Sequence, residues 1–388
     1  MTKKIYIRSF GCQMNTRDSE VICGLLKAQG YKLMVDPDEA DVVIFNTCSV
    51  RQHAEDKVWS QIGQMNKSGS AKRKIIGLVG CMAQNYKNGV FQRAPGVDFV
   101  VGPADIHKIP GIINKLSVPG FQLSVKKLFE AKIWETEGDI RPEDIYHTGF
   151  YQDKKHAYVV ISEGCFNHCS YCVVPYVRGE LRNRNYQDIL KEIEEATAVG
   201  ITSVTLLGQN VNAYQSSTLA HQSSVDFREL LRMVDGIKGL EEFTFITSHP
   251  KDTTLDLFEV MAELKKLKKY LHLPVQSGSD KILKLMNRGY TRKYYLDLVE
   301  NYRRIVKGGL LSTDIIVGFP GESQEDFLAT YALLKEIKFD SAYIFKYSVR
   351  PHTPAQILVD DVARAEKEKR HKLVLDLQKE ISRKCLKN

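Results

Sequence analysis

Residues 165–172 read Cys-Phe-Asn-His-Cys-Ser-Tyr-Cys, which places three thiols at CxxxCxxC spacing in one short loop. The apolar run Ala157–Ile161 precedes the loop, and a helical pattern over Asp188–Ala198 follows it. Three thiolates from one loop can hold three corners of a cubane iron-sulfur cluster, and the fourth iron then has no protein ligand. The loop therefore predicts a cluster with one iron open to another ligand.

The strand-then-helix rhythm that begins with this loop continues to the end of the chain. Further apolar runs, each followed by a polar or glycine-rich segment, are Ser203–Leu207, Glu242–Thr247, Tyr270–Val275, Leu310–Val317 and Ala342–Tyr347. Rhythm alone does not separate an open parallel sheet from a barrel, but polar sequence after every strand is typical of the catalytic face of a barrel. We expect a partial (β/α)6 barrel of the TIM type over residues 157–360.

The first 140 residues predict a separate α/β domain with a doubly wound parallel sheet of the Rossmann or flavodoxin type. Strands are expected at Ile5–Phe10, Tyr31–Val35, Asp41–Phe45, Lys74–Val79 and Asp98–Val101, with helices over Ser19–Gln29 and Gln52–Met65. Three of these strands run into a cysteine, namely Cys12, Cys48 and Cys81. Because parallel strands share one carboxyl edge, we expect the three thiols to converge there.

The remaining segments and the composition set limits on the class of protein. Residues 141–156 predict a polar linker, and residues 361–388 predict a basic helix with Val374, Leu377 and Ile381 on one stripe. With 43% hydrophobic and 26% charged residues, the chain has the composition of a soluble globular protein. No apolar run is long enough for a membrane helix, and the first one breaks at Arg8, too early for a signal peptide.

We therefore expect a cytoplasmic protein whose eight cysteines are reduced, so that clustered thiols indicate metal or redox chemistry. The net charge of +8 is compatible with an RNA partner but is weak evidence alone. The loop could instead be a zinc knuckle with His168 as the fourth ligand, and the N-terminal thiols could be unrelated. Cys23 and Cys385 lie on apolar stripes and are expected to be packing residues. His249, His272 and His352 lie near strand ends and could touch substrate, but we expect surface or structural roles for them.

The cysteine loop resembles the signature of the radical S-adenosylmethionine superfamily. That resemblance implies that Cys165, Cys169 and Cys172 hold a [4Fe-4S] cluster, whose free iron binds the amine and carboxylate of S-adenosylmethionine. Reduction of the sulfonium then yields a 5′-deoxyadenosyl radical. The residues that the resemblance assigns to this cofactor are Tyr171 at the adenine, Gly208, Gln209 and Asn210 at the methionine amine, Gln276, and Gly318 and Glu322 in the segment that supports the adenosine.

The N-terminal motifs, residues 11–15, 46–51 and 80–84, resemble those of the methylthiotransferases within this superfamily. The resemblance implies a second [4Fe-4S] cluster on Cys12, Cys48 and Cys81, which holds the sulfur that one S-adenosylmethionine methylates, while another S-adenosylmethionine supplies the radical. Two metal centres that face each other across an interdomain cleft are therefore expected. The resemblance extends over nearly the whole chain.

Residues 13–15 and 18–20 resemble the branch that acts on N6-isopentenyladenosine at position 37, beside the tRNA anticodon. The expected partners are then the tRNA anticodon stem-loop, a reductase such as flavodoxin or ferredoxin, and a sulfur donor. Alternatives are methylthiolation of threonylcarbamoyladenosine in tRNA or of a ribosomal protein, and a non-catalytic iron-sulfur carrier. The basic residues Arg178, Arg182 and Arg184 either face phosphate or form a solvated turn. The sequence stops at Asn388, so we expect the family's small RNA-binding β-barrel (TRAM) domain to be absent.

Overall fold

The computed structural model describes residues 3–49, 52–67, 73–117, 132–138, 140–218 and 221–385. Internal packing divides the chain into two compact units. The first comprises Met1–Lys154 and Val174–Gly179, and the second comprises Lys155–Val173 and Glu180–Asn388. The short segment Val174–Gly179 thus follows the cysteine loop in the sequence but packs with the first unit.

The first unit is built on a parallel sheet with the strand order β2-β1-β3-β4-β5-β6. Its strands are β1 (Lys4–Phe10), β2 (Lys32–Leu33), β3 (Val42–Thr47), β4 (Ile75–Val79), β5 (Phe99–Val101) and β6 (Ile133–Glu135). The predicted α/β fold with an N-terminal parallel sheet is therefore confirmed. Strand β6 lies at the sheet edge and is not among the strands expected from the sequence.

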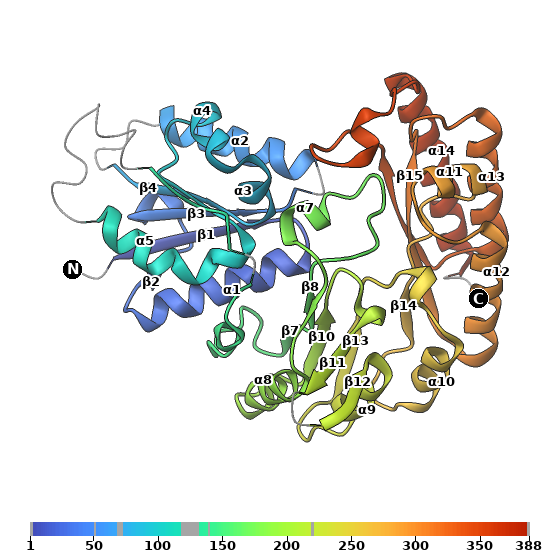
Figure 1. Cartoon of the computed structure of the whole chain (residues 1–388), viewed down its shortest axis with the longest axis horizontal. Coiled ribbons are helices and arrows are strands. Elements are labelled where there is room, and N and C mark those ends of the chain that lie inside the picture. Colours follow the sequence, from blue (N-terminus) through green and yellow to red (C-terminus); the bar gives the residue numbers. More distant parts are fainter. Residues whose placement is uncertain are drawn as a thin grey trace. The chain divides into compact units, whose positions relative to one another are not determined.

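Helices cover both faces of this sheet, as Figure 1 shows. One face carries α2 (Gln52–Lys67), α3 (Cys81–Tyr86) and α4 (Val90–Arg93), and the other carries α1 (Gln13–Ala28) and α5 (Ile109–Leu116). Val58 and Ile62 of α2 pack with Phe45 and Leu78 of the sheet in one buried apolar cluster. Two faces covered by helices explain why the central strands read as continuous apolar runs.

Helix α1 begins six residues before the predicted start at Ser19. Its first turns carry polar side chains that are nevertheless buried, among them Asn15, Arg17 and Asp18. An amphipathic pattern predicts burial only for apolar residues, so it misses a helix whose start is buried through hydrogen bonds and ion pairs. The polar start of α1 lies beside the cysteines of this unit.

The second unit contains the six predicted parallel strands in two sheets of three. They are β7 (His156–Val160), β10 (Ser203–Leu207) and β13 (Glu242–Phe245), in the order β13-β10-β7, and β14 (Tyr270–His272), β15 (Leu310–Val317) and β16 (Ser341–Lys346) in chain order. A parallel bridge between Phe243 and Leu267 connects β13 to the segment that leads into β14. The barrel curvature remains a prediction.

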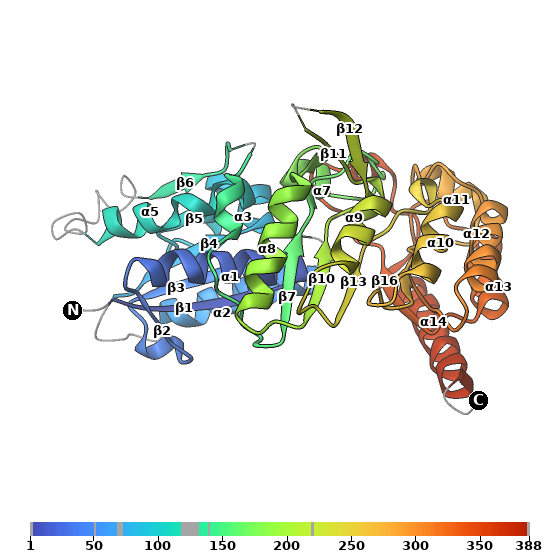
Figure 2. The ribbon, with the colours of Figure 1, turned by 90° about the horizontal axis from the view of Figure 1, so that it is seen from below.

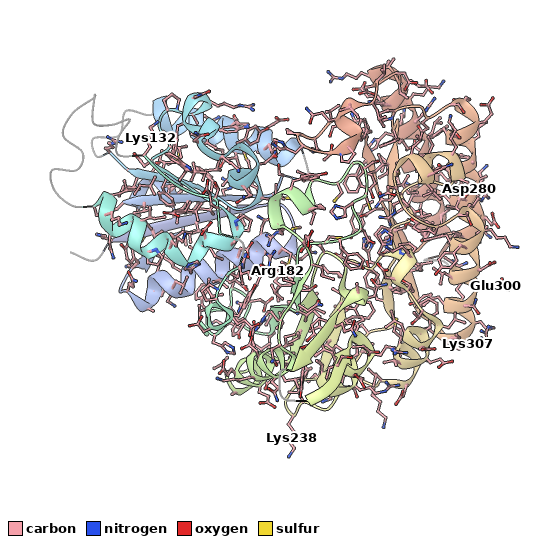
Figure 3. The ribbon with its side chains drawn as sticks, viewed as in Figure 1. Lys132, Arg182, Lys238, Asp280, Glu300 and Lys307 are labelled. Carbon is pink, nitrogen blue, oxygen red and sulfur yellow. The ribbon has the colours of Figure 1, made fainter. Side chains whose placement is uncertain are left out.

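The helices of the second unit follow its strands along the chain. They are α8 (Tyr186–Ala198), α9 (Phe227–Asp235), α10 (Leu255–Glu263), α11 (Asp280–Leu285), α12 (Arg292–Ile305), α13 (Gln324–Ile337) and α14 (Arg364–Cys385). Figure 3 shows Glu300 of α12 and the nearby Lys307 pointing outward, as expected for the solvent face of a covering helix. The predicted stripe Val374, Leu377 and Ile381 is the buried face of α14.

Two antiparallel strand pairs complete the second unit. Strands β8 (Ser162–Glu163) and β9 (Arg182–Asn183) pair on either side of the cysteine loop. Strands β11 (Gln215–Thr218) and β12 (His221–Asp226) form a hairpin that stands out from the unit in Figure 2. No helix within the described ranges has both the length and the apolar character needed to cross a membrane.

Candidate functional site

The structure brings the three N-terminal cysteines to one edge of the first sheet. Strands β1, β3 and β4 are neighbours in parallel register, so that Phe10 lies beside Thr47 at the carboxyl end of the sheet. Cys12, Cys48 and Cys81 follow directly after these strand ends. The strand order reverses between β1 and β3, and such reversals are where parallel α/β sheets bind ligands.

Two glycines allow the cysteine loops to approach one another. Gly11 has φ +139°, and a Cβ built on it would lie under 3.0 Å from the Cβ of Cys48. Gly80 has φ +89°, and its Cβ would similarly clash with the amide oxygen of Asn46. Both positions therefore need glycine for backbone conformation and for space.

An asparagine pair joins two of these loops. The Nδ2 of Asn15 donates to Asn46 Oδ1 at 2.9 Å, and the Nδ2 of Asn46 donates to the carbonyl oxygen of Asn15 at 2.8 Å. Both side chains are buried. The Sγ of Cys12 lies 3.3 Å from Asn15 Oδ1. The Asn15–Asn46 pair therefore sets the position of the Cys12 loop against β3.

A buried arginine reaches the same edge from α7 (Val174–Arg178). The Nε of Arg178 lies 3.3 Å from the Sγ of Cys81, and its Nη2 donates to Asp18 Oδ2 at 2.6 Å. Arg141 Nη1 donates to the other carboxylate oxygen of Asp18 at 2.8 Å. Burial disfavours the charged carboxylate, but the two guanidiniums outweigh it and keep the pKa of Asp18 below its usual value.

Neither prediction for Arg178, a phosphate contact or a solvated turn, describes its buried position. Arg184 is likewise buried and is paired with Asp188 and Glu192.

The electrostatic surroundings distinguish the thiols. A hydrogen bond from Cys48, together with the charge of Arg178, lowers the pKa of Cys12 to about 6 despite burial. Burial raises the pKa of Cys81. Because the thiolate is the form that binds metal, the site already favours the ligating form of Cys12.

The cysteine loop of the second unit is anchored to the turn after α11. Ser170 donates from its backbone nitrogen to Met286 O at 3.0 Å and from its hydroxyl to Leu285 O at 2.7 Å. Asn287 Nδ2 donates to His168 O at 3.0 Å, and His168 has φ +44°. These bonds hold the tight loop on which Cys165, Cys169 and Cys172 lie.

Arg288 is the main polar neighbour of this loop, and no sequence motif indicated it. Its Nη1 lies 3.3 Å from Cys169 Sγ and 3.4 Å from the hydroxyl of Tyr171, and its Nη2 donates to Pro274 O at 2.8 Å. Each unit thus places one buried guanidinium against one cysteine sulfur. An Asn-Arg-Gly triplet after a short helix offers no local pattern from which this role could be read.

His249 also lies beside the loop, with its Nε2 3.9 Å from the Sγ of Cys169. Burial, and after it the charges of Arg288 and Lys251, lower the pKa of His249 to about 2. The ring is therefore neutral at physiological pH, and its Nδ1 accepts a hydrogen bond from the Lys251 backbone nitrogen at 3.2 Å. The structural or surface role expected for His249 stays a prediction.

Buried acceptors without a partner among the described residues occur at three of the residues assigned to S-adenosylmethionine and at Asn167 of the cysteine loop. Asn210 Nδ2 donates to Asp252 Oδ2 at 2.7 Å and Asn167 Nδ2 donates to the same oxygen at 3.2 Å, which fixes both amides. Their Oδ1 atoms, and the Oε1 atoms of Gln209 and Gln276, are buried without a partner among the described residues. Buried polar atoms normally have partners. Each of these oxygens can accept a hydrogen bond from a ligand that donates one, and the ammonium of S-adenosylmethionine is such a donor.

The segment assigned to the adenosine lies near Tyr171, but Glu322 is already bonded within the protein. Tyr171 packs against an apolar cluster that contains Ile316 and Phe319. Gly318 has φ +70°, and its nitrogen donates to Glu322 Oε2 at 2.6 Å. Glu322 therefore shapes its own loop, and only its Oε1 has no partner in the described part of the protein.

Both thiol sets have the donor chemistry of an iron-sulfur cluster. In the described residues, no three cysteine, histidine or acidic side chains lie close enough to hold a single metal ion as they stand. The sulfur donors, the neighbouring guanidinium and the unpaired acceptors fit a clustered iron site with S-adenosylmethionine beside one of the two sets. The expected placement of the two sets face to face stays a prediction.

Two family models match the chain. Residues 4–102 match the model described as Uncharacterized protein family UPF0004, and residues 159–334 match the Radical SAM superfamily. The chain is 42% identical over 386 residues to the tRNA-2-methylthio-N(6)-dimethylallyladenosine synthase of Prosthecochloris aestuarii, covering 98% of this chain and 84% of that protein. It is 43% identical to the synthase of the same name from Carboxydothermus hydrogenoformans, covering 100% and 86%.

Solved structures with low sequence identity share the fold. The radical S-adenosylmethionine methyltransferase TsrM from Kitasatospora setae, with tryptophan and a S-adenosylmethionine analogue bound, matches with a TM-score of 0.62 at 14% identity. That match covers 92% of this chain and 75% of TsrM. The cobalamin-dependent radical enzyme OxsB matches with a TM-score of 0.54 at 12% identity, over 99% of this chain and 56% of OxsB. At these identities the matches show the fold alone.

Proposed function

The chain belongs to the radical S-adenosylmethionine methylthiotransferases of the tRNA-2-methylthio-N(6)-dimethylallyladenosine synthase family, and we propose that it transfers a methylthio group to C2 of N6-isopentenyladenosine at position 37 of tRNA. The enzyme class follows from 42–44% identity over most of the chain to the curated synthases. The position in tRNA and the number of clusters and cofactor molecules belong to the proposal.

One observation carries the proposal most directly: the first unit holds three thiols after three strand ends, the second holds three thiols in one loop, and each set has a guanidinium beside one of its sulfurs. In the first unit the contact is between Arg178 and Cys81, and in the second it is between Arg288 and Cys169. A carrier of a single cluster would need only one such set. We therefore propose two [4Fe-4S] clusters, one on each set, and two molecules of S-adenosylmethionine for each methylthio group.

A radical route suits this substrate because an aromatic C–H bond has neither a leaving group nor useful acidity. When bound, one cluster with S-adenosylmethionine supplies a carbon-centred radical, and the other cluster supplies the sulfur. Gln209, Asn210 and Gln276 would hold the methionine ammonium, because their buried side-chain oxygens have no partner among the described residues. Tyr171 of the cysteine loop packs against the apolar cluster that contains Ile316 and Phe319, where it would contact the adenine. Gly318 and Glu322 hold that segment in shape.

The partners follow from the reaction. The tRNA anticodon stem-loop is the substrate, a reductase such as flavodoxin or ferredoxin supplies electrons, and a separate donor renews the sulfur. The net charge of +8 is compatible with a polyanionic substrate. Because this substrate is tRNA, we propose that the enzyme works in the cytoplasm.

The test uses a strain without the gene, complemented with wild-type protein, Cys48→Ala or Cys23→Ser. Mass spectrometry of tRNA nucleosides should find 2-methylthio-N6-isopentenyladenosine with the wild type and with Cys23→Ser, whose thiol lies on α1 outside the three motifs. Cys48→Ala should leave N6-isopentenyladenosine unmodified at C2.

Three outcomes would contradict the proposal. Unchanged methylthiolation in the deletion strain excludes this tRNA assignment, provided that no second gene product does the same reaction. A methylthio group found instead on threonylcarbamoyladenosine or on a ribosomal protein reassigns the substrate. Anaerobically reconstituted protein with one cluster and no 5′-deoxyadenosine production would make the chain a non-catalytic carrier.

A further inference from the structure

Arg178 has an unusual position for a residue six places after the last cysteine of the loop. It ends helix α7, a segment that packs with the first unit, against α3 and the 3-10 turn Pro103–Lys108. Its side chain is 3% exposed. The Nε–H group points at the Sγ of Cys81 over 3.3 Å. The guanidinium is therefore part of the edge at which Cys12, Cys48 and Cys81 meet.

Asp18 fixes the orientation of this guanidinium. Its Oδ2 accepts from Arg178 Nη2 at 2.6 Å, while its Oδ1 accepts from Arg141 Nη1 at 2.8 Å. Arg141 also donates to Pro103 O at 2.8 Å. Because the Nη2 of Arg178 is held by a carboxylate, its Nε is left to face the sulfur, and the direction of the Nε–H bond is set by the planar guanidinium.

The charges of this group favour an anion beside it. Asp18, Arg141 and Arg178 together carry one negative and two positive charges, and all three side chains are buried. A buried guanidinium is stabilised by a negative group beside it. A cluster held by three thiolates is such a negative group, and the Cys81 sulfur in contact with Arg178 is one of its proposed ligands.

We propose that Arg178, held by Asp18, is a positioning residue that tunes the cluster on Cys12, Cys48 and Cys81 and raises its reduction potential. The inference rests on the proposed function, because it takes these thiols as cluster ligands. A hydrogen bond to a ligating sulfur and a nearby positive charge both stabilise the reduced cluster, which carries one more negative charge. Neighbours of metal ligands also affect metal affinity, so Arg178 should in addition support cluster occupancy.

The test isolates this cluster by changing Cys165, Cys169 and Cys172 together to Ala. The full-length protein is reconstituted anaerobically, its iron and sulfide are counted, and its midpoint potential is measured by a redox titration followed by electron paramagnetic resonance. In this background Arg178→Gln removes the charge, Arg178→Lys keeps the charge but lacks the Nε–H, and Arg182→Gln is the matched control. Arg182, labelled in Figure 3, pairs with Glu163 on β8 and is 28% exposed.

Arg178→Gln should change the ratio of reduced to oxidised cluster at a given potential at least about tenfold, a shift of about 59 mV toward more negative values for one electron. Arg178→Lys should shift the potential in the same direction by less, and Arg182→Gln should leave it unchanged. A wild-type potential in both Arg178 variants with full occupancy overturns the inference. If Arg178→Gln binds no iron, the midpoint potential of Arg178→Lys alone tests the inference. If the triple cysteine variant itself binds no cluster, the proposed function is wrong instead.

Discussion

Arg370 of the C-terminal helix holds Glu322 by two hydrogen bonds from one nitrogen. Its Nη1 donates to Glu322 Oε2 at 2.6 Å and to Glu322 O at 2.9 Å, and both side chains are buried. Burial raises the pKa of Glu322 although Arg370 opposes it. The basic helix α14 therefore fixes the loop after β15 that we assign to the adenosine of S-adenosylmethionine.

Replacing Arg370 by Met should destabilise the second unit and weaken cofactor binding, because it leaves Glu322 buried without its cation. The free energy of unfolding should fall by about 3 kcal/mol. Urea unfolding measures the first effect, and equilibrium dialysis of S-adenosylmethionine with reconstituted protein measures the second. Lys369→Met, at an exposed position of the same helix, serves as the control. An Arg370→Met protein with wild-type stability would show that the ion pair is not needed to hold the loop.

Gly11→Ala should cost the first unit its cluster. The new Cβ would meet the Cβ of Cys48 at under 3.0 Å, at a backbone φ of +139° that alanine rarely adopts. Iron analysis of the reconstituted variant should therefore show about half the wild-type content. Gly63→Ala is the matched control, since Gly63 lies inside α2 and a Cβ added there would have no neighbour within 4 Å. That change should stabilise the protein by about 0.5–1 kcal/mol. Wild-type iron content in Gly11→Ala would contradict the close approach of the two loops.

Asn46→Ala should lower stability and cluster content together. Asn46 gives up its bonds with Asn15 and with the Ser19 hydroxyl, the latter at 3.0 Å, and Asn15 is left buried with an unpaired amide. Unpaired buried polar groups cost about 1–3 kcal/mol each. Thermal or urea unfolding of the apo protein and iron analysis of the reconstituted protein measure the two effects. Asn88→Ala, at an exposed site of the same unit, should change neither. Loss of stability without loss of iron would limit the pair to a structural role.

The sequence predicted the strands and the meeting of the three N-terminal thiols well because both depend on local patterns. Continuous apolar runs mark strands that are covered on both faces, and parallel direction then brings Cys12, Cys48 and Cys81 to one edge without further information. Helix α14 was predicted equally well, because its apolar residues recur with the period of an α-helix.

What the sequence did not predict depends on contacts between distant segments. Arg178 is local in sequence to the cysteine loop, yet its partner Asp18 lies 160 residues away. Arg288 is 119 residues from the cysteine that it contacts. The polar residues at the start of α1 are buried because they form hydrogen bonds and ion pairs with distant residues. The spacing of apolar residues in the sequence does not predict such burial. Motif resemblance found the cysteines themselves, and the motif at residues 11–15 contains Asn15, but it did not indicate that Arg178 and Arg288 contact cysteine sulfurs.

Asp252 makes another such long-range contact, and it gives a test of the cofactor site. Its Oδ2 accepts from the amides of both Asn210 and Asn167, whose Oδ1 atoms are buried without a partner among the described residues. In Asp252→Ala both amides can turn, and the acceptors are no longer held in place. We expect the dissociation constant of S-adenosylmethionine to rise about tenfold, which corresponds to about 1.4 kcal/mol.

Equilibrium dialysis on protein with its clusters reconstituted gives this dissociation constant without turnover. Asp256→Ala is the matched control, because Asp256 is an exposed acid on α10 that pairs with Arg228. Its binding should equal that of the wild type. Since Asn167 lies between Cys165 and Cys169, iron must be counted in both variants, and only a rise in the dissociation constant at full iron content supports the assignment. An unchanged constant in Asp252→Ala would mean that Asn210 does not receive the amine, and that the unpaired oxygens there bind another donor.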